Sequence, residues 1–339
     1  MRALRMIAIA LAVIVVALGV LYVAGPREPV DLAVTVDEDA IRADPVAYLA
    51  ETEGRFENIR PGKQKEIVYA FPRSKAKTPL AIVYAHGFSA SRAEIEPVAS
   101  DIARALGANL YFMRLTGHGR DGPAMGEATV NDWMRDMAEA LAIAETIGER
   151  TVVVGTSTGA ALGALAALEP GTRERIDALV QISPYYALAD PRGKLLDLPF
   201  ARHLVRLVEG EERGFEPVTA LHGENWTTRY PSSAVVVVAA LVRELRGRTF
   251  ENAAVPSLFL FDEGDRVVDH ELTRKIAGRW GRATGARVNI ELVEGTDDPY
   301  RHVIAGDSLS PSTSGRATDA IVHWIESLGL DGAGEPRAS

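Results

Sequence analysis

No cysteine occurs in the 339 residues, so the sequence excludes disulfide bonds, thiolate nucleophiles and cysteine-ligated zinc. The chain also lacks a cluster of lysine and arginine residues, and its formal net charge at pH 7 is −9. Nucleic-acid binding needs a basic face, so this charge argues against nucleic acid as a partner. We find no internal repeat, no low-complexity tract, and no residue pattern that indicates a metal, nucleotide or other cofactor site.

One long apolar segment stands at the N-terminus. Arg2 and Arg5 precede the run Met6–Ala24, which contains no charged residue. A helix of this length, at about 1.5 Å per residue, is close to the thickness of the hydrocarbon core of a bilayer. We therefore expect residues 1–25 to form a single-pass anchor, with the N-terminus cytoplasmic and the rest of the chain periplasmic or otherwise extracytoplasmic. The alternatives are a signal peptide that is cleaved before secretion, and a buried core helix.

The next segment, residues 26–64, is charged and proline-containing, and we expect a stalk with one short helix at about 45–53. Beyond it, strand and helix signals alternate. The pattern Ser91-Arg92-Ala93-Glu94 resembles a capping box and predicts a helix start, and Thr129 opens a further helix that ends at Gly148. Strands are indicated by the runs KEIVYAF, LAIVYAHG, NLYFMRL, TVVVG, ALVQIS, SLFLF and VNIELV.

This alternation predicts an α/β fold with a mostly parallel, doubly wound sheet over residues 65–330. Residues of about 185–255 interrupt the alternation, because they contain no clear strand and include the apolar run Ala234–Val242. An insertion of this size after a sheet strand is typical of a helical cap over the site. We expect the tail, 331–339, to be flexible.

The sequence GTSTG at 155–159 has the pattern G-x-S-x-G, and it lies between a buried strand and a run of small helix formers. In this context the pattern predicts a nucleophile elbow. A serine on so tight a turn adopts a strained backbone, and larger side chains at Gly155 and Gly159 would collide with the neighbouring strand and helix. We therefore expect Ser157 to be a nucleophile.

A serine nucleophile needs a base, and the base needs an acid that orients it. In folds with this elbow the chain order is serine, acid, histidine. Of the seven histidines, only His302 lies in a loop after the last predicted strand, so we expect it to be the base. In the loop FDEGDRVVD, Asp265 is preferred as the acid because it lies beyond the strand end and precedes two valines. Asp262 is the alternative.

A tetrahedral intermediate also needs backbone N–H groups aimed at its oxyanion. One is expected from Thr158, which follows the nucleophile, and the second from the loop Ala85-His86-Gly87-Phe88-Ser89, where Phe88 is the candidate. His86 precedes Ser157 at a strand end, so we expect it to be structural.

The segments AHGF, LTGHG, GTSTG, FDEGDRVVD and RHV together resemble the α/β-hydrolase superfamily. They are most similar to its branch of monoacylglycerol lipases, carboxylesterases and serine aminopeptidases, in a membrane-anchored bacterial form, and the resemblance covers residues 65–328. It implies the α/β-hydrolase fold and a structural role for His118. It also implies the same catalytic set: Ser157, Asp265 and His302, with Phe88 and Thr158 in the oxyanion hole.

We therefore expect a serine hydrolase that cleaves carboxylic esters through an acyl-enzyme. The apolar run Val235–Val238 and the membrane anchor favour a lipid-like or acylglycerol-type ester. One alternative is a serine aminopeptidase or amidase, and another is an inactive hydrolase fold that serves as a binding module. An aminopeptidase needs a cap carboxylate to hold the substrate amine, and the cap offers Glu209, Glu211, Glu212, Glu216 and Glu224.

Overall fold

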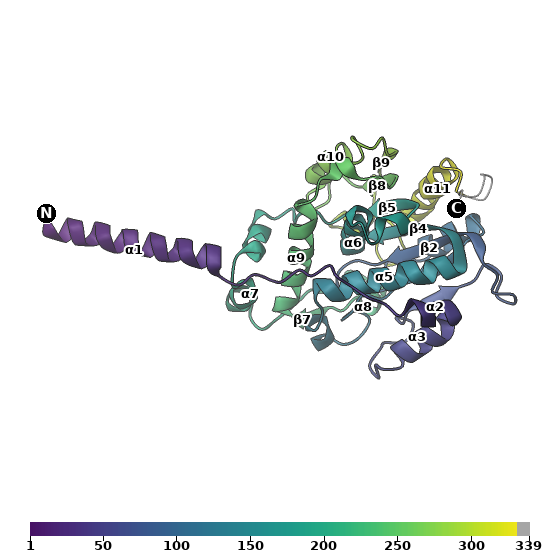
Figure 1. Ribbon diagram of the computed structural model, residues 1–339, viewed down its shortest axis with the longest axis horizontal. Coiled ribbons are helices and arrows are strands. Elements are labelled where there is room, and N and C mark those ends of the chain that lie inside the picture. Colours follow the sequence, from purple (N-terminus) through teal and green to yellow (C-terminus); the bar gives the residue numbers. More distant parts are fainter. Residues whose placement is uncertain (331–339) are drawn as a thin grey trace.

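A seven-stranded sheet forms the centre of the computed structural model, which describes residues 1–330 (Figure 1). The tail at 331–339, expected to be flexible, lies outside the described residues. The strand order is β1-β3-β2-β4-β5-β8-β9; β1 is antiparallel to β3, and all other neighbours are parallel. This arrangement confirms the predicted fold class. The strands are β1 (Glu66–Val68), β2 (Thr78–Ala85), β3 (Asn109–Phe112), β4 (Gly148–Thr156), β5 (Ala178–Ile182), β8 (Ser257–Phe261) and β9 (Val288–Leu292).

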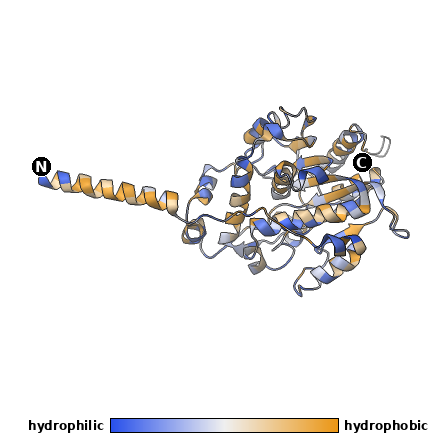
Figure 2. Cartoon of the chain, viewed as in Figure 1, coloured by the Kyte–Doolittle hydropathy of each residue, from blue (hydrophilic) through white to orange (hydrophobic). Residues whose placement is uncertain are grey.

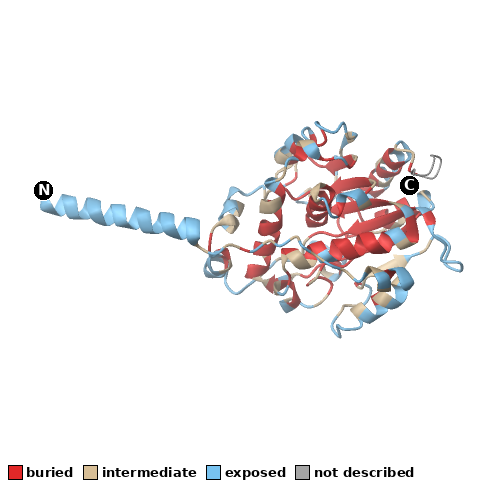
Figure 3. Cartoon of the chain, in the orientation of Figure 1, coloured by how far each residue is buried: buried red, intermediate tan, exposed pale blue. Residues whose placement is uncertain are grey.

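Helices cover both faces of the sheet. Successive side chains of a strand point to opposite faces, and the central strands carry apolar side chains on both faces. On β2, Ala81 and Val83 pack into one hydrophobic core, and Leu80 and Ile82 pack into the other. Figure 3 shows the sheet buried between these layers. The first core contains α5 (Val130–Ile147), α6 (Thr158–Leu168), α9 (Val235–Arg246) and α10 (His270–Ala277); the second contains α4 (Val98–Ala105) and α11 (Pro311–Glu326).

The helix starts differ in how well their caps were predicted. At α5, Thr129 and Asp132 form a reciprocal capping box, as the sequence suggests. The capping box predicted at Ser91 and Glu94 is wrong, since α4 begins only at Val98. The Glu94 side chain turns inward to accept hydrogen bonds from other groups, so it does not cap a helix.

The region expected to form the cap contains α7 (Ala201–Glu209), α8 (Ala220–Asn225) and α9. It also contains a small antiparallel sheet of β6 (Glu212–Gly214) and β7 (Arg229–Pro231), which the sequence did not indicate. Strands of three residues are too short to produce a recognisable alternation. The apolar run of α9 packs mainly onto the core beside α6.

The N-terminal helix α1 (Arg2–Ala24) extends away from the body, and none of its residues is buried (Figures 1 and 3). In Figure 2 most of this helix has the colour of hydrophobic residues. It is long and apolar enough to cross a membrane, although a signal sequence has the same length and composition.

The following segment, residues 26–64, lies along the body and forms α2 (Glu38–Ala43) and α3 (Pro45–Glu53). Ile41 of α2 is fully buried in the core beside α5, so this segment is part of the folded body.

Candidate active site

Ser157 stands on a sharp turn between β4 and α6, with φ 51° and ψ −111°. This backbone conformation is strained for a residue with a side chain. It is held by the Ser157 N–H, which donates to the Ile182 carbonyl at 2.8 Å. A Cβ at Gly155 would lie 2.6 Å from the Ala160 Cα, and one at Gly159 would overlap the Ala85 carbonyl oxygen. Only glycine fits on either side of the serine, which explains the spacing in the sequence.

Three residues expected to act together lie in one hydrogen-bonded chain. His302 Nε2 is 3.0 Å from Ser157 Oγ, and His302 Nδ1 is 2.8 Å from Asp265 Oδ2. They follow the carboxyl ends of β4, β8 and β9, which lie at the same edge of the parallel sheet. The other carboxylate oxygen, Asp265 Oδ1, accepts N–H groups of Val267 and Val268 at 2.7 and 2.9 Å. These bonds fix the carboxylate toward the imidazole.

The alternative acid, Asp262, points elsewhere. It pairs with Arg301 at 2.9 Å and accepts the Gly264 N–H at 2.7 Å. A different carboxylate, Asp298, supports the histidine loop, because its Oδ2 accepts the N–H groups of His302 and Val303, each at 2.9 Å. Sequence reasoning missed Asp298; its position four residues before His302 in a loop was the available signal.

The electrostatics around His302 suit a base. Burial lowers the pKa of His302, but the charge of Asp265 and its hydrogen bond raise it more, so the pKa lies above its ordinary value. An imidazolium formed at this position is therefore stabilised by the neighbouring carboxylate.

The two expected oxyanion donors, Phe88 and Thr158, line the same cavity as Ser157. Thr158 is the first residue of α6, and first-turn N–H groups of a helix have no carbonyl partner within the helix. The loop that carries Phe88 is held on both sides. The Gly87 N–H donates to Glu94 Oε2 at 2.6 Å, and the Ser89 carbonyl accepts the Thr227 N–H at 2.6 Å.

Glu94 is a buried acid that sequence reasoning assigned to a helix cap. Its Oε2 also accepts the Tyr84 hydroxyl at 2.9 Å, and the residue lines the cavity. Burial raises the pKa of Glu94 to about 7, against the lowering effect of its hydrogen bonds. A single sequence carries no signal for this contact, because it depends on how the loop after β2 folds back.

The two histidines expected to be structural are buried near the site. His86 Nδ1 lies 2.9 Å from the Gly87 carbonyl oxygen, and its Nε2 accepts the Leu115 N–H at 3.2 Å. Burial lowers the pKa of His86 to about 4 and also lowers the pKa of His118. Both rings are therefore neutral near pH 7 and hold backbone segments in place.

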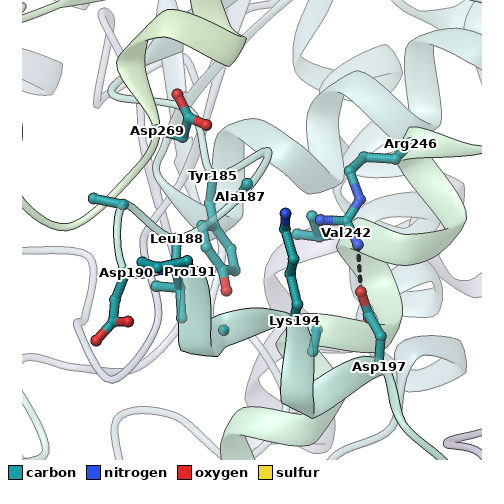
Figure 4. Close-up of a pocket in the computed structure, with 13 residues that line it drawn as sticks. Tyr185, Ala187, Leu188, Asp190, Pro191, Lys194, Asp197, Val242, Arg246 and Asp269 are labelled. Atoms are coloured by element: carbon teal, nitrogen blue, oxygen red, sulfur yellow. Dashed lines mark hydrogen bonds and ion pairs between the residues drawn. The ribbon is translucent and has the colours of Figure 1, made fainter.

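The cavity above Ser157 has a volume of about 260 Å³. Arg213 and Glu94 are its charged lining residues apart from the histidine. A second cavity, of about 150 Å³, shares Tyr185 and Leu188 with it, and Figure 4 shows the Arg246–Asp197 ion pair of 2.6 Å beside that cavity. Within residues 1–330, no group of three acidic or histidine side chains is arranged for a metal ion. The apolar wall of the larger cavity includes Leu188, Leu196, Val235, Val238, Val267, Val268 and Val303.

Comparison with solved structures supports the fold. The chain is similar to a structure of the metagenome-derived lipolytic enzymes LipS and LipT, with 20% identity, a TM-score of 0.60, and coverage of 79% of this chain and 99% of the other. It is also similar to a monoacylglycerol lipase from Paleococcus ferrophilus, with 15% identity, a TM-score of 0.58, and coverage of 78% and 98%. A monoglyceride lipase from Saccharomyces cerevisiae gives 12% identity, a TM-score of 0.57, and coverage of 78% and 91%.

Comparison of sequences identifies the family. No curated protein sequence matches the chain. The family model described as serine aminopeptidase, S33, matches residues 76–295, which span β2 to β9 and include Ser157 and Asp265. The chain therefore belongs to the serine aminopeptidase S33 family of α/β hydrolases.

Proposed function

We propose that this hydrolase cleaves carboxylic esters through an acyl-enzyme, with Ser157 as nucleophile, His302 as base and Asp265 as the orienting acid. The observation that carries the proposal is the hydrogen-bonded chain of 3.0 and 2.8 Å from Ser157 through His302 to Asp265, which opens into a largely apolar cavity. An inactive binding module would not need this continuous chain.

In the first half of the reaction, Ser157 Oγ attacks the ester carbonyl carbon and its proton passes to His302 Nε2. The carbonyl oxygen becomes an oxyanion that accepts hydrogen bonds from the Phe88 and Thr158 N–H groups, near the positive end of α6. The C–O bond then breaks, and His302 Nε2 returns the proton to the leaving alcohol. Ser157 is left acylated.

In the second half, His302 Nε2 removes a proton from water, and the resulting oxygen attacks the acyl carbon. The same N–H groups stabilise the second oxyanion. His302 gives the proton back to Ser157 Oγ as the acid product leaves. Throughout both halves, Asp265 holds the imidazole in one tautomer and stabilises its charged form.

An ester substrate is favoured over a peptide by the charges at the cavity. An aminopeptidase binds the amino terminus of its substrate, a cation, so it needs a carboxylate above the nucleophile. The five cap glutamates considered from the sequence are all exposed. The charged cap residue that lines the cavity is Arg213, which repels an ammonium group. The lining carboxyl outside the cap, Glu94, accepts hydrogen bonds from the Gly87 N–H and the Tyr84 hydroxyl.

The cavity walls favour an acyl group of short or medium length. Val235 and Val238 of α9 line the cavity together with Leu188 and Leu196, which supports an apolar, acylglycerol-type acyl chain. The volume of about 260 Å³ lies just below the usual range for ligand sites, about 300–1,000 Å³. Long acyl chains would need the cap to open.

We also propose that α1 anchors the chain in a membrane, with the hydrolase domain and its cap on the extracytoplasmic side. The positive flank at Arg2 and Arg5 supports this orientation. We place the hydrolase domain at 65–330 and the cap at about 185–255. Residues 26–64 link this domain to the anchor while packing along it.

A substrate panel tests the proposed activity. The full-length chain in a mild detergent is assayed with p-nitrophenyl esters of increasing acyl length and with aminoacyl p-nitroanilides, and the Ser157→Ala variant provides the background rate. We expect ester turnover that is highest for short and medium acyl groups, and no turnover of the anilides. A preference for aminoacyl anilides would instead favour the aminopeptidase.

A further inference from the structure

The cap helix α7 has an apolar face that stays largely exposed among residues 1–330, the part of the chain that the structure describes. Leu204 and Leu207 are three residues apart on the helix, Phe200 is the N-cap residue before it, and their exposed fractions are 40%, 83% and 38%. An adjacent side of the helix is buried, since Ala201 and Val205 pack with Val236 of α9. We call the first three residues the α7 apolar face.

The helix α7 lies beside the end of α1 (Figure 1). The Phe200 N–H donates to the Pro26 carbonyl at 2.8 Å, and a Cβ at Gly25 would lie 2.7 Å from the Phe200 ring. At the same end of α1, the Arg27 guanidinium lies 5.1 Å from the centre of the Tyr22 ring and donates to the Tyr22 carbonyl. Tyrosine and arginine are typical of the membrane–water interface, so they mark where α1 would leave a bilayer.

The position of α7 relative to α1 is fixed by the linker. Glu28 is buried and forms a bidentate ion pair with Arg202 of α7, in which Arg202 Nε and Nη2 each lie 2.6 Å from a Glu28 carboxylate oxygen. Its carbonyl accepts a hydrogen bond from Arg243 of α9 at 2.7 Å. These contacts hold α7 and α9 to the residues directly after the anchor.

From this geometry, we propose that the α7 apolar face inserts into the interfacial layer of the same bilayer that holds α1. A helix with one apolar and one charged face binds membrane surfaces in this way. Arg202 and Arg206 lie on α7 outside the apolar face, and each is paired with an acid of this chain, Glu28 and Glu211, so the apolar contact carries the proposal. The proposal rests on the proposed anchoring by α1 and does not require ester hydrolysis.

Membrane docking would place the mouth of the active site at the lipid surface. The buried side of α7 packs with Leu196 and Val235, and both residues also line the cavity above Ser157. An amphiphilic ester could therefore pass from the bilayer to the nucleophile along the cap without crossing bulk water.

Because the chain has no cysteine, single labels can test the docking directly. Leu207→Cys and the control Asp319→Cys, an exposed position on α11 at the far end of the body, are labelled with an environment-sensitive fluorophore. Both full-length proteins are reconstituted in phosphatidylcholine–phosphatidylglycerol vesicles, and flotation confirms that α1 is inserted. We expect nitroxide-labelled lipids to quench the label at 207 and not the label at 319. Equal quenching at the two positions in floated vesicles overturns the proposal.

A second variant tests the consequence for substrate delivery. Leu207→Asp places a charge on a largely exposed side chain outside the site. We expect it to reduce turnover of a medium-chain monoacylglycerol in vesicles by about tenfold, because the apolar contact with lipid is lost. Turnover of water-soluble p-nitrophenyl butyrate should stay unchanged. Equal rates for variant and native protein on the vesicle substrate contradict lipid delivery. If the native protein cleaves neither ester, the proposed activity is contradicted, and the quenching experiment alone decides whether α7 docks on the membrane.

Discussion

Replacing Glu94 by glutamine should remove a strong pH dependence from the stability of the fold. Glu94 is only 2% exposed, and it accepts a hydrogen bond from the Gly87 N–H in the loop that carries Phe88. Burial raises its pKa to about 7, from an ordinary value of 4.5. Glutamine has nearly the same shape and retains one acceptor oxygen for the loop, but it cannot ionise.

The size and sign of the effect follow from linkage. At about 1.36 kcal/mol per pKa unit, the shift corresponds to about 3 kcal/mol. Between about pH 4.5 and pH 7, the folded protein keeps a proton on Glu94 that the unfolded chain has released. The contribution of protonated Glu94 to the free energy of unfolding is therefore fully present below pH 4.5 and is lost as the pH rises through 7.

The assay is urea unfolding of the native chain and Glu94→Gln at pH 5 and pH 8, followed by tryptophan fluorescence. The two proteins should have similar free energies of unfolding at pH 5, and the variant should be more stable by about 3 kcal/mol at pH 8. Glu57→Gln, at an exposed position, controls for general loss of charge. A stability difference between native chain and Glu94→Gln that does not change with pH would refute the reasoning.

Three further substitutions, one of them with a matched glycine control, test other parts of the site. Asp265→Asn should lower kcat roughly 10³–10⁴-fold. Because Asp265 raises the pKa of His302, the acid limb of the pH–rate profile should also move to lower pH in this variant. An acid limb that does not move contradicts the coupling between Asp265 and His302. Gly159→Ala should lower the free energy of unfolding by at least about 1–3 kcal/mol, since the new methyl group meets the Ala85 carbonyl. Gly315→Ala, in open space on α11, should raise it by up to about 1 kcal/mol in the same urea series. Asp298→Ala should lower kcat while a soluble ester's KM changes little, because the carboxylate holds the His302 loop rather than substrate; a change in KM alone would argue against this role.

The sequence was most informative where local pattern and chain order act together. The G-x-S-x-G pattern between a buried strand and a helix predicts the turn at Ser157, and the structure places that serine at φ 51° on such a turn. Chain order then selects His302 from seven histidines, and the structure brings it within 3.0 Å of Ser157. The choice between Asp265 and Asp262 depended on a single loop, and the side-chain directions that separate them come only from the structure.

The residues that sequence reasoning missed act through contacts with distant backbone. Glu94 fits a capping-box pattern locally, but burial beside Gly87 and Tyr84 overrides that local preference. Asp298 resembles any loop carboxylate until the fold shows that it accepts the His302 N–H. The segment after α1 is charged and was expected to form a stalk, and the structure buries Ile41 and Leu49 of this segment in the core that contains α5.

The apolar run of α9 illustrates a different limit. A helix with valines on several sides is equally suited to a substrate wall and to core packing. The structure divides these roles by face, because Val235 lines the cavity, Val237 and Leu241 lie in the core, and Val238 takes part in both. Periodicity predicts that such residues are covered, but it does not indicate what covers them.

Labelling with a fluorophosphonate probe, followed by peptide mass spectrometry, tests the central claim that Ser157 is an activated nucleophile. We expect one adduct on the full-length chain, located at Ser157, which disappears in Ser157→Ala and persists in Ser312→Ala. Labelling that survives in Ser157→Ala, or a native chain that takes up no probe, would contradict it.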